Sequence, residues 1–195
     1  VIARSRTVLE KWAAALASES VPTVILGSQT SFKDEFATGR LLQLAKFCLE
    51  PTELNRAVIV ELLNNPFTGL DTLSIRRIQR RLRQLELDAG GDRTSEELLV
   101  ELFEKPEVAR ELYGEEGKRV KIFLKVLAKT RELAETEGST SEEVLWSLWS
   151  SSPMASYWQD LSSCIGEVAL QAGRNLDSLV ALFSAANQYA ERHPE

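Results

Sequence analysis

The sequence has few of the side chains that most enzymes use for metal binding or nucleophilic catalysis. Its 195 residues include two cysteines and one histidine. A metal site needs about four ligands in a readable spacing, so we expect no metal in this chain. His193 lies in the polar segment ERHPE, where a solvated histidine is expected. A G-x-S-x-G motif is also absent and the carboxylates are scattered, which argues against a free-standing enzyme.

Two further absences concern the compartment. No run of eighteen apolar residues occurs, which excludes a membrane-spanning helix, and no positively charged leader precedes an apolar core. Cys48 and Cys164 each have apolar neighbours, which predicts two buried thiols rather than a disulfide. We therefore expect a cytoplasmic protein that does not engage a membrane. The opening residues VIARS lack a Met and suggest a strand in mid-element, so we interpret the chain as a piece of a larger protein.

The chain is long enough to bury a core, and its composition, 44% hydrophobic and 27% charged, is that of a globular protein. Val1 to Ala3 and VPTVILG, residues 21–27, have the pattern of short strands, and residues 5–18 between them have helical spacing. Strand, helix and strand form a βαβ unit. No comparable strand signal follows, so we expect 1–27 to be the edge of another domain and 28–195 to be all-α.

Helical spacing recurs along the second region. Helices are expected over 34–50, 53–65, 74–85, 94–105, 118–137, 139–152 and 175–193. Thr94 with Glu97 and Ser139 with Glu142 are spaced as capping boxes, which mark helix N-termini. Four aromatic residues cluster late in the chain, and such side chains are usually core. They are Trp146, Trp149, Tyr157 and Trp158.

An arginine-rich segment stands out in a chain whose net charge is −6. Within SIRRIQRRLRQL, residues 74–85, the arginines are Arg76, Arg77, Arg80, Arg81 and Arg83. At about 100° per residue, a helix places the four apolar side chains of this segment within an arc of roughly 80° and every arginine outside it. Those apolar residues are Ile75, Ile78, Leu82 and Leu85. The pattern predicts a helix held by an apolar seam that presents a guanidinium surface.

This surface has two interpretations. Charge runs are usually solvated faces balanced by acidic neighbours, and residues 91–117 hold nine acidic against three basic residues. However, like charges at i and i+4 repel one another, which favours an external polyanion. The preceding turn TGLD, residues 68–71, leads into a helix N-terminus that Asp71 or Thr72 can cap. Because free amides and the helix dipole favour phosphate there, DNA-backbone binding is one of the two interpretations.

Five segments, in order along the chain, carry a resemblance to a known family. They are VIARSRTVLEKWAAALASESVPTVILG, SFKDEFATGRLLQLAKFCLEP, VIVELLNNPFTGLDTLSIRRIQ, SEEVLWSLWSSSPMASYW and LDSLVALFSAANQYAERHP. The first is similar to the 2A motor subdomain of the UvrD/Rep/PcrA group of superfamily 1 DNA helicases, and the others to its inserted 2B subdomain. The actinobacterial AdnA/AdnB type is most similar. This resemblance implies an all-α 2B-type subdomain over 28–195, preceded by a βαβ remnant of a RecA-like motor domain.

The resemblance also implies DNA contacts. In the family, a GIG turn touches duplex phosphates through backbone amides, and Gly69 and Leu70 match its first two positions. Asp71 stands at the position of the second glycine, where an acidic side chain repels phosphate unless it turns inward as a helix cap. The arginines that follow this turn would then supply the positive charge.

Residues 4–6 match the part of the family's 2A subdomain that lies along single-stranded DNA. They are Arg4, Ser5 and Arg6; a plain strand-to-helix cap is the alternative for Ser5 and Arg6. The chain has no G-x-x-x-x-G-K-[ST] loop and no Walker B-like motif. The resemblance therefore implies that other parts of the parent protein bind ATP and Mg²⁺, and that this chain holds no cofactor and no catalytic residue.

Two functions follow as expectations. The first is a DNA-engaging accessory or regulatory subdomain of an ATP-dependent DNA helicase that acts in unwinding, repair or recombination. Its partners would be a DNA duplex or single/double-strand junction and the remaining motor domains. The second is an interaction module that holds a paired helicase subunit and makes no DNA contact. Salt dependence separates them, because phosphate contacts weaken steeply with ionic strength.

Overall fold

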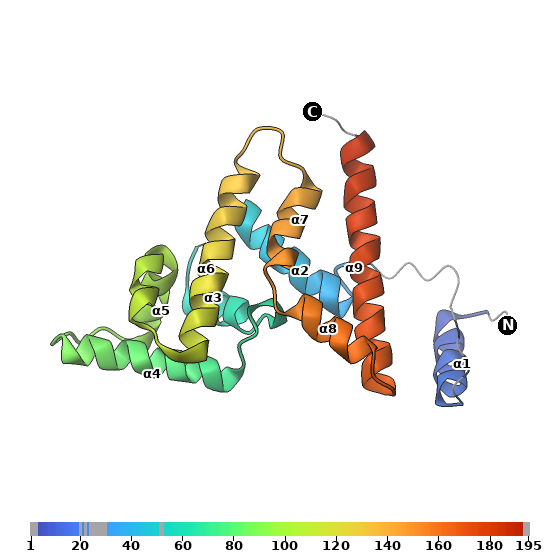
Figure 1. The fold of residues 1–195 in the computed structure, drawn as a ribbon, viewed down its shortest axis with the longest axis horizontal. Coiled ribbons are helices and arrows are strands. Elements are labelled where there is room, and N and C mark those ends of the chain that lie inside the picture. Colours follow the sequence, from blue (N-terminus) through green and yellow to red (C-terminus); the bar gives the residue numbers. More distant parts are fainter. Residues whose placement is uncertain (1–3, 20, 22, 24–30, 51–52, 193–195) are drawn as a thin grey trace. The chain divides into compact units, whose positions relative to one another are not determined.

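The computed structural model describes residues 4–19, 21, 23, 31–50 and 53–192. The chain divides into two compact units, Val1–Ser31 and Phe32–Glu195, where the sequence predicts a boundary after Gly27. It is mainly helical, as predicted, and its described residues include no strand (Figure 1). Within this described part, no helix has both the length and the apolar character that crossing a membrane requires.

The described α-helices are α1 Arg6–Ser18, α2 Phe36–Leu49, α3 Arg56–Leu63, α4 Thr72–Asp88, α5 Ser95–Glu104, α6 Gly114–Ala134, α7 Ser141–Ser150, α8 Met154–Ser162 and α9 Glu167–Arg192. Two short 3₁₀ helices, η1 Pro66–Thr68 and η2 Pro106–Glu111, lie before α4 and α6. Each 3₁₀ helix opens with a proline, which has no amide hydrogen to leave unpaired at a helix start.

The first unit contains α1, which confirms the helix predicted over residues 5–18. Its two predicted strands fall at 1–3 and 21–27, and these lie outside the described residues except for Val21 and Thr23, which belong to no regular element. The βαβ arrangement therefore stays a prediction.

The core of the second unit is built around α2, which packs against α6, α7 and α9. On another side, α3 packs on α5, and α4 packs on α5 and α6, so that α4 lies across one end of α6 (Figure 1). Aliphatic side chains that are fully shielded from solvent come mainly from α2, α3 and α5. They include Leu41, Leu44, Ile59, Leu63, Leu99 and Leu102. This packing holds α4 by one face and leaves its other face on the surface.

The helix starts show where the sequence predictions succeed and fail. The capping box of Thr94 and Glu97 is confirmed, with both reciprocal hydrogen bonds present at the start of α5. The second box lies one residue later than predicted, on Thr140 and Glu143. Ser139 lies instead in the turn that follows α6, where its hydroxyl donates to the Thr136 carbonyl at 2.6 Å.

The predictions of burial are wrong for three side chains, those of Cys164, Trp146 and Tyr157. Cys48 is buried as predicted, but Cys164, in the turn between α8 and α9, is exposed. Burial raises the pKa of the Cys48 thiol to about 11. Trp158 and the half-buried Trp149 pack on Phe67, each with ring centroids 5.8 Å away, whereas Trp146 and Tyr157 are more than half exposed. The aromatic cluster is therefore only partly core.

Candidate nucleic-acid interface

The turn that leads into α4 is held by the residues before it. The buried hydroxyl of Thr68 donates to the Leu63 carbonyl at 2.9 Å and accepts from the Leu70 amide at 3.0 Å. Gly69 has φ +68°, a left-handed conformation that glycine adopts without strain. Its amide donates to the Pro66 carbonyl at 3.0 Å. Thr68 and Gly69 thus fix the direction in which the chain enters the helix.

This arrangement changes the predicted role of the turn. The amides of Gly69 and Leu70, predicted to touch phosphates, both donate hydrogen bonds within the chain, and the Leu70 side chain is buried. Neither amide is free for a ligand in this conformation. The Gly69 carbonyl instead accepts a hydrogen bond from the guanidinium of Arg119 on α6. An anion at this turn would meet side-chain guanidinium groups rather than these two amides.

Asp71 is the N-cap of α4. Its carboxylate accepts from the Ser74 amide at 2.7 Å, as the sequence allows. That hydrogen bond holds the pKa of Asp71 below its usual value, so the side chain is ionised at neutral pH. Because the carboxylate is exposed beside the arginine helix, it places one negative charge at the edge of the candidate interface.

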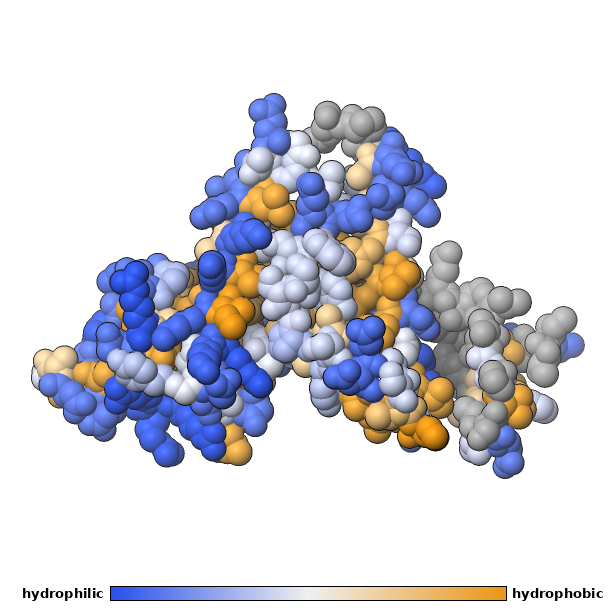
Figure 2. Space-filling view, viewed as in Figure 1, coloured by the Kyte–Doolittle hydropathy of each residue, from blue (hydrophilic) through white to orange (hydrophobic). Residues whose placement is uncertain are grey.

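The seam of α4 is confirmed. Ile75, Ile78 and Leu82 are buried, and Leu85 is half-buried. Four of the five arginines are exposed and Arg83 is half-buried, so all of them lie outside the seam. Figure 2 shows the end of the molecule around α4 and α5 covered mainly by hydrophilic side chains. The predicted guanidinium surface is therefore present.

Three of these arginines interact with their own chain. Arg77 forms an ion pair with Glu116, with 2.6 Å between its guanidinium and the carboxylate, and its hydrogen bond lowers the pKa of Glu116. Arg83 donates to the carbonyl of Arg93. Arg81 lies over the ring of Tyr113, 5.8 Å from the centroid. The interpretation of a face balanced by acidic neighbours thus holds for Arg77.

Arg76 and Arg80 differ from the other three. They lie one turn apart on α4 and are exposed, and within the described residues neither has an ion pair, a hydrogen bond or an aromatic contact. The acidic side chains closest in sequence are committed elsewhere. Asp71 caps α4, and Glu86 binds Arg93 with 2.6 Å between charged atoms. These two arginines are therefore available to an external anion.

Sequence reasoning missed three members of this surface. They are Tyr113, Arg119 and Lys121, in the segment LYGEEGKRVK. Because α6 packs against α4, Tyr113 meets Arg81 of α4 and Arg119 meets Gly69 of the preceding turn. Lys121 lies 5.9 Å from the centroid of the Tyr113 ring, measured from its ammonium nitrogen. The available signal was an aromatic residue before a Gly, followed after two glutamates by three basic residues of one helix, but the neighbours of this ring could not be read from the sequence.

The other predicted DNA contacts lie in the first unit. Arg4 and Ser5 are exposed, and the Ser5 carbonyl accepts from the Leu9 amide at 3.3 Å. Arg6 is the first residue of α1. This agrees with a plain helix start at Ser5 and Arg6. Their predicted contact with single-stranded DNA stays a prediction.

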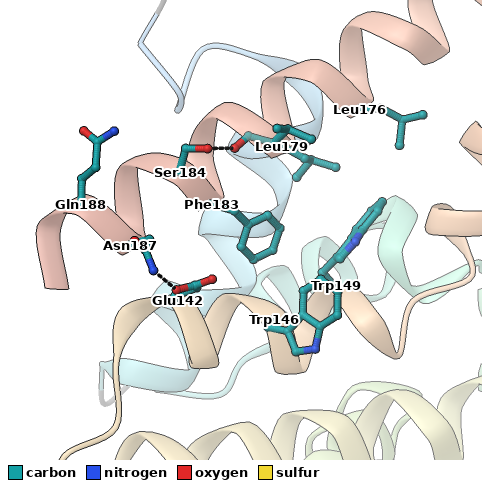
Figure 3. A pocket seen from close by; sticks show the side chains of 10 residues that line it. Glu142, Trp146, Trp149, Leu176, Leu179, Phe183, Ser184, Asn187 and Gln188 are labelled. Carbon is teal, nitrogen blue, oxygen red and sulfur yellow. Dashed lines mark hydrogen bonds between the residues drawn. The ribbon is translucent and has the colours of Figure 1, made fainter. Parts of the chain in front are cut away.

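A second surface feature is a groove of about 630 Å³ between α7 and α9. In Figure 3, Trp146 and Trp149 of α7 face Phe183 of α9 across it, and Glu142 accepts a hydrogen bond from Asn187 at 2.9 Å. Trp146 is 57% exposed, although its ring packs on Phe183 with centroids 5.8 Å apart. This groove is apolar and is separate from the arginine surface.

No protein-family model matches the chain, and a comparison with curated proteins finds no match either.

Proposed function

We propose that this chain is a DNA-binding accessory subdomain of an ATP-dependent DNA helicase, and that α4 contacts the phosphates of duplex DNA. The observation that carries the proposal is the pair of exposed arginines, Arg76 and Arg80, which have no partner among the described residues of an acidic chain. The resemblance to the UvrD/Rep/PcrA group supports the helicase context. ATP binding and hydrolysis would belong to other domains of the parent protein.

The chemistry of the surface suits a phosphate backbone. A guanidinium group offers several donors in a planar fork that matches phosphate oxygens, and it stays charged at any physiological pH. Contacts of this kind position a protein on DNA without reading its sequence. The chain's net charge of −6 limits unspecific attraction, so binding should depend on the basic surface of α4 rather than on the chain as a whole.

Removing both free arginines tests the proposal. The double variant Arg76→Gln/Arg80→Gln is compared with the unaltered chain by fluorescence anisotropy, with a labelled blunt duplex over a salt series. If both arginines bind phosphates, we expect the slope of log K against log salt to flatten by about 2. Affinity at low salt should fall at least tenfold. The readout is the slope, because a general loss of folding would not change it in this way.

The matched control is Lys125→Gln/Lys129→Gln, which removes the same two charges, one turn apart, from an exposed face of α6. This control should keep the steep slope. An equal loss in both variants would show that net charge, and not the α4 surface, drives binding. Absence of binding at low salt in the unaltered chain would contradict the proposed function.

Asp71→Asn should strengthen DNA binding. Asparagine keeps the oxygen that accepts the Ser74 amide, so the cap survives, but the negative charge at the edge of the interface is lost. We expect about a threefold gain in affinity at low salt, because exposed charge interactions are weak. Asp160→Asn, on the exposed face of α8, removes the same charge elsewhere and should leave affinity unchanged. An unchanged affinity for Asp71→Asn would place DNA away from the start of α4.

The groove between α7 and α9 supports a second candidate function, an interaction module that holds a paired helicase subunit. An exposed Trp146 beside Phe183 is the kind of aromatic anchor that protein interfaces use. Apolar contacts of this type respond weakly to salt. Binding of a partner that survives high salt, in a chain that shows no DNA binding at low salt, would favour this function over the first.

A further inference from the structure

Of the aromatic side chains that the structure describes, Tyr113 is the most exposed, at 71%. It lies between η2 and α6, with Arg81 of α4 at 5.8 Å and Lys121 of α6 at 5.9 Å from its ring centroid. Both distances are near the outer limit of a cation–π interaction, which is about 6 Å. Both cations thus lie over the ring near this limit, and most of the Tyr113 surface still stays open to solvent.

The backbone that carries this ring is firmly held. The neighbouring Leu112 is buried, and its amide donates to the Ala109 carbonyl at 3.0 Å. Gly117 of α6 lies so close that a Cβ there would be 2.5 Å from the Leu112 carbonyl oxygen. Lys121 in turn donates to the Arg110 carbonyl at 3.3 Å. Because these contacts hold the backbone around Tyr113, binding a ligand would order only the side chain and not the segment that carries it.

An exposed aromatic ring with two cations close to it suits the binding of single-stranded nucleic acid. A base stacks on the ring, and the adjoining phosphates take the cations. In an intact duplex each interior base is already stacked on both neighbours, so only an unpaired or terminal base can use the ring. Arg81 and Lys121 have no acidic partner within the described residues, and this leaves their charge for phosphate.

The arginines of α4 point to two different flanks of the helix. Arg80 and Arg81 are consecutive and therefore point about 100° apart around the helix. Arg76 and Arg80 lie on one flank, whereas Arg81 lies on the flank that meets Tyr113. A duplex on the first flank and an unpaired strand on the second would place the branch point of the DNA over α4.

We propose that Tyr113 is a stacking site for an unpaired base, so that this surface binds a junction between single-stranded and duplex DNA. The inference rests on the proposed function, because it assigns the unpaired strand to the same DNA that Arg76 and Arg80 hold. Arg81 and Lys121 contact the phosphates on either side of the stacked base.

The test compares Tyr113→Ala with Tyr113→Phe in the full chain. The probes are a blunt duplex and the same duplex with an oligo-dT tail on either strand, and binding is measured by anisotropy. We expect Tyr113→Ala to weaken binding of the tailed duplex about tenfold, since stacking of one base contributes at that level. The blunt duplex, which offers only its two end base pairs for stacking, should be affected much less. Tyr113→Phe keeps the ring and should bind as the unaltered chain does. Tyr157→Ala, an exposed ring on α8, is the matched control and should also bind normally.

A second measurement does not depend on affinity. 2-Aminopurine placed in the tail beside the junction should be quenched when it stacks on Tyr113, and Tyr113→Ala should abolish the quenching at saturating protein. The inference would be overturned if Tyr113→Ala and the unaltered chain bound the tailed duplex equally and quenched the probe equally. In that case a loss of binding by Arg76→Gln/Arg80→Gln would still support the proposed function. Failure of the unaltered chain to bind either probe at low salt would overturn both.

Discussion

Replacing Leu99 with alanine is expected to lower the free energy of unfolding of the unit Phe32–Glu195 by about 3 kcal/mol. Leu99 lies on α5 and is completely buried in the shared core. Deleting its branched end removes apolar contact and leaves a cavity that the surrounding helices fill only in part, which costs roughly 2–5 kcal/mol. Urea unfolding followed by circular dichroism should show a lower midpoint and an unchanged slope.

Leu73→Ala is the matched control for this change. Leu73 is 59% exposed near the start of α4, so the same deletion there opens no cavity. We expect its effect to stay within about 0.5 kcal/mol. A similar loss for both variants would mean that α5 is not part of the core that limits stability.

Asn65→Ala is expected to destabilise the same unit by about 3 kcal/mol, through hydrogen bonds rather than apolar contact. The Asn65 side chain is completely buried. It donates to the Arg40 carbonyl of α2 at 2.9 Å and accepts from the Phe67 amide at 3.1 Å. Alanine leaves the Phe67 amide without this partner, and a buried unsatisfied group costs about 1–3 kcal/mol before the lost packing is added. Because Phe67 packs on Trp149 and Trp158, tryptophan emission should report the unfolding.

The neighbouring Asn64 provides the comparison. It is exposed at the end of α3, and its backbone is in the ordinary right-handed region, which alanine also adopts. Asn64→Ala should therefore be close to neutral. If Asn64→Ala were as destabilising as Asn65→Ala, the loss would come from helix termination and not from the buried side chain.

Periodicity along one helix was enough to predict the seam of α4. Ile75, Ile78 and Leu82 recur at the spacing of one helical face, and nothing outside the segment is needed to see which side is buried. The Asp71 cap was predictable for the same reason, since the residues concerned are three apart in sequence. Local signals of this kind also placed the Thr94 capping box.

Pairings between distant segments could not be predicted from such signals. Arg77 meets Glu116, and Arg81 meets Tyr113, because α6 packs against α4. The periodicity of a helix shows which of its faces is buried, but not which other helix packs against that face. The sequence therefore revealed five arginines, but not which of them, Arg76 and Arg80, would lack a partner among the residues that the structure describes. The hydrogen bond of the Leu70 amide likewise depends on how Thr68 turns its hydroxyl inward, which residue types alone do not decide.

The two cysteines lie in unequal environments, so thiol reagents should modify only one of them in the native protein. A maleimide is attacked by a thiolate and not by a thiol. Cys48 has a pKa of about 11, so it is almost entirely protonated at neutral pH, and its burial also shields it from reagents. Cys164 is exposed, with its sulfur 3.6 Å from the Asp160 carbonyl oxygen. A dye added to the native protein should therefore attach at the turn between α8 and α9 and nowhere else, and would report distances to labelled DNA without the introduction of any new residue.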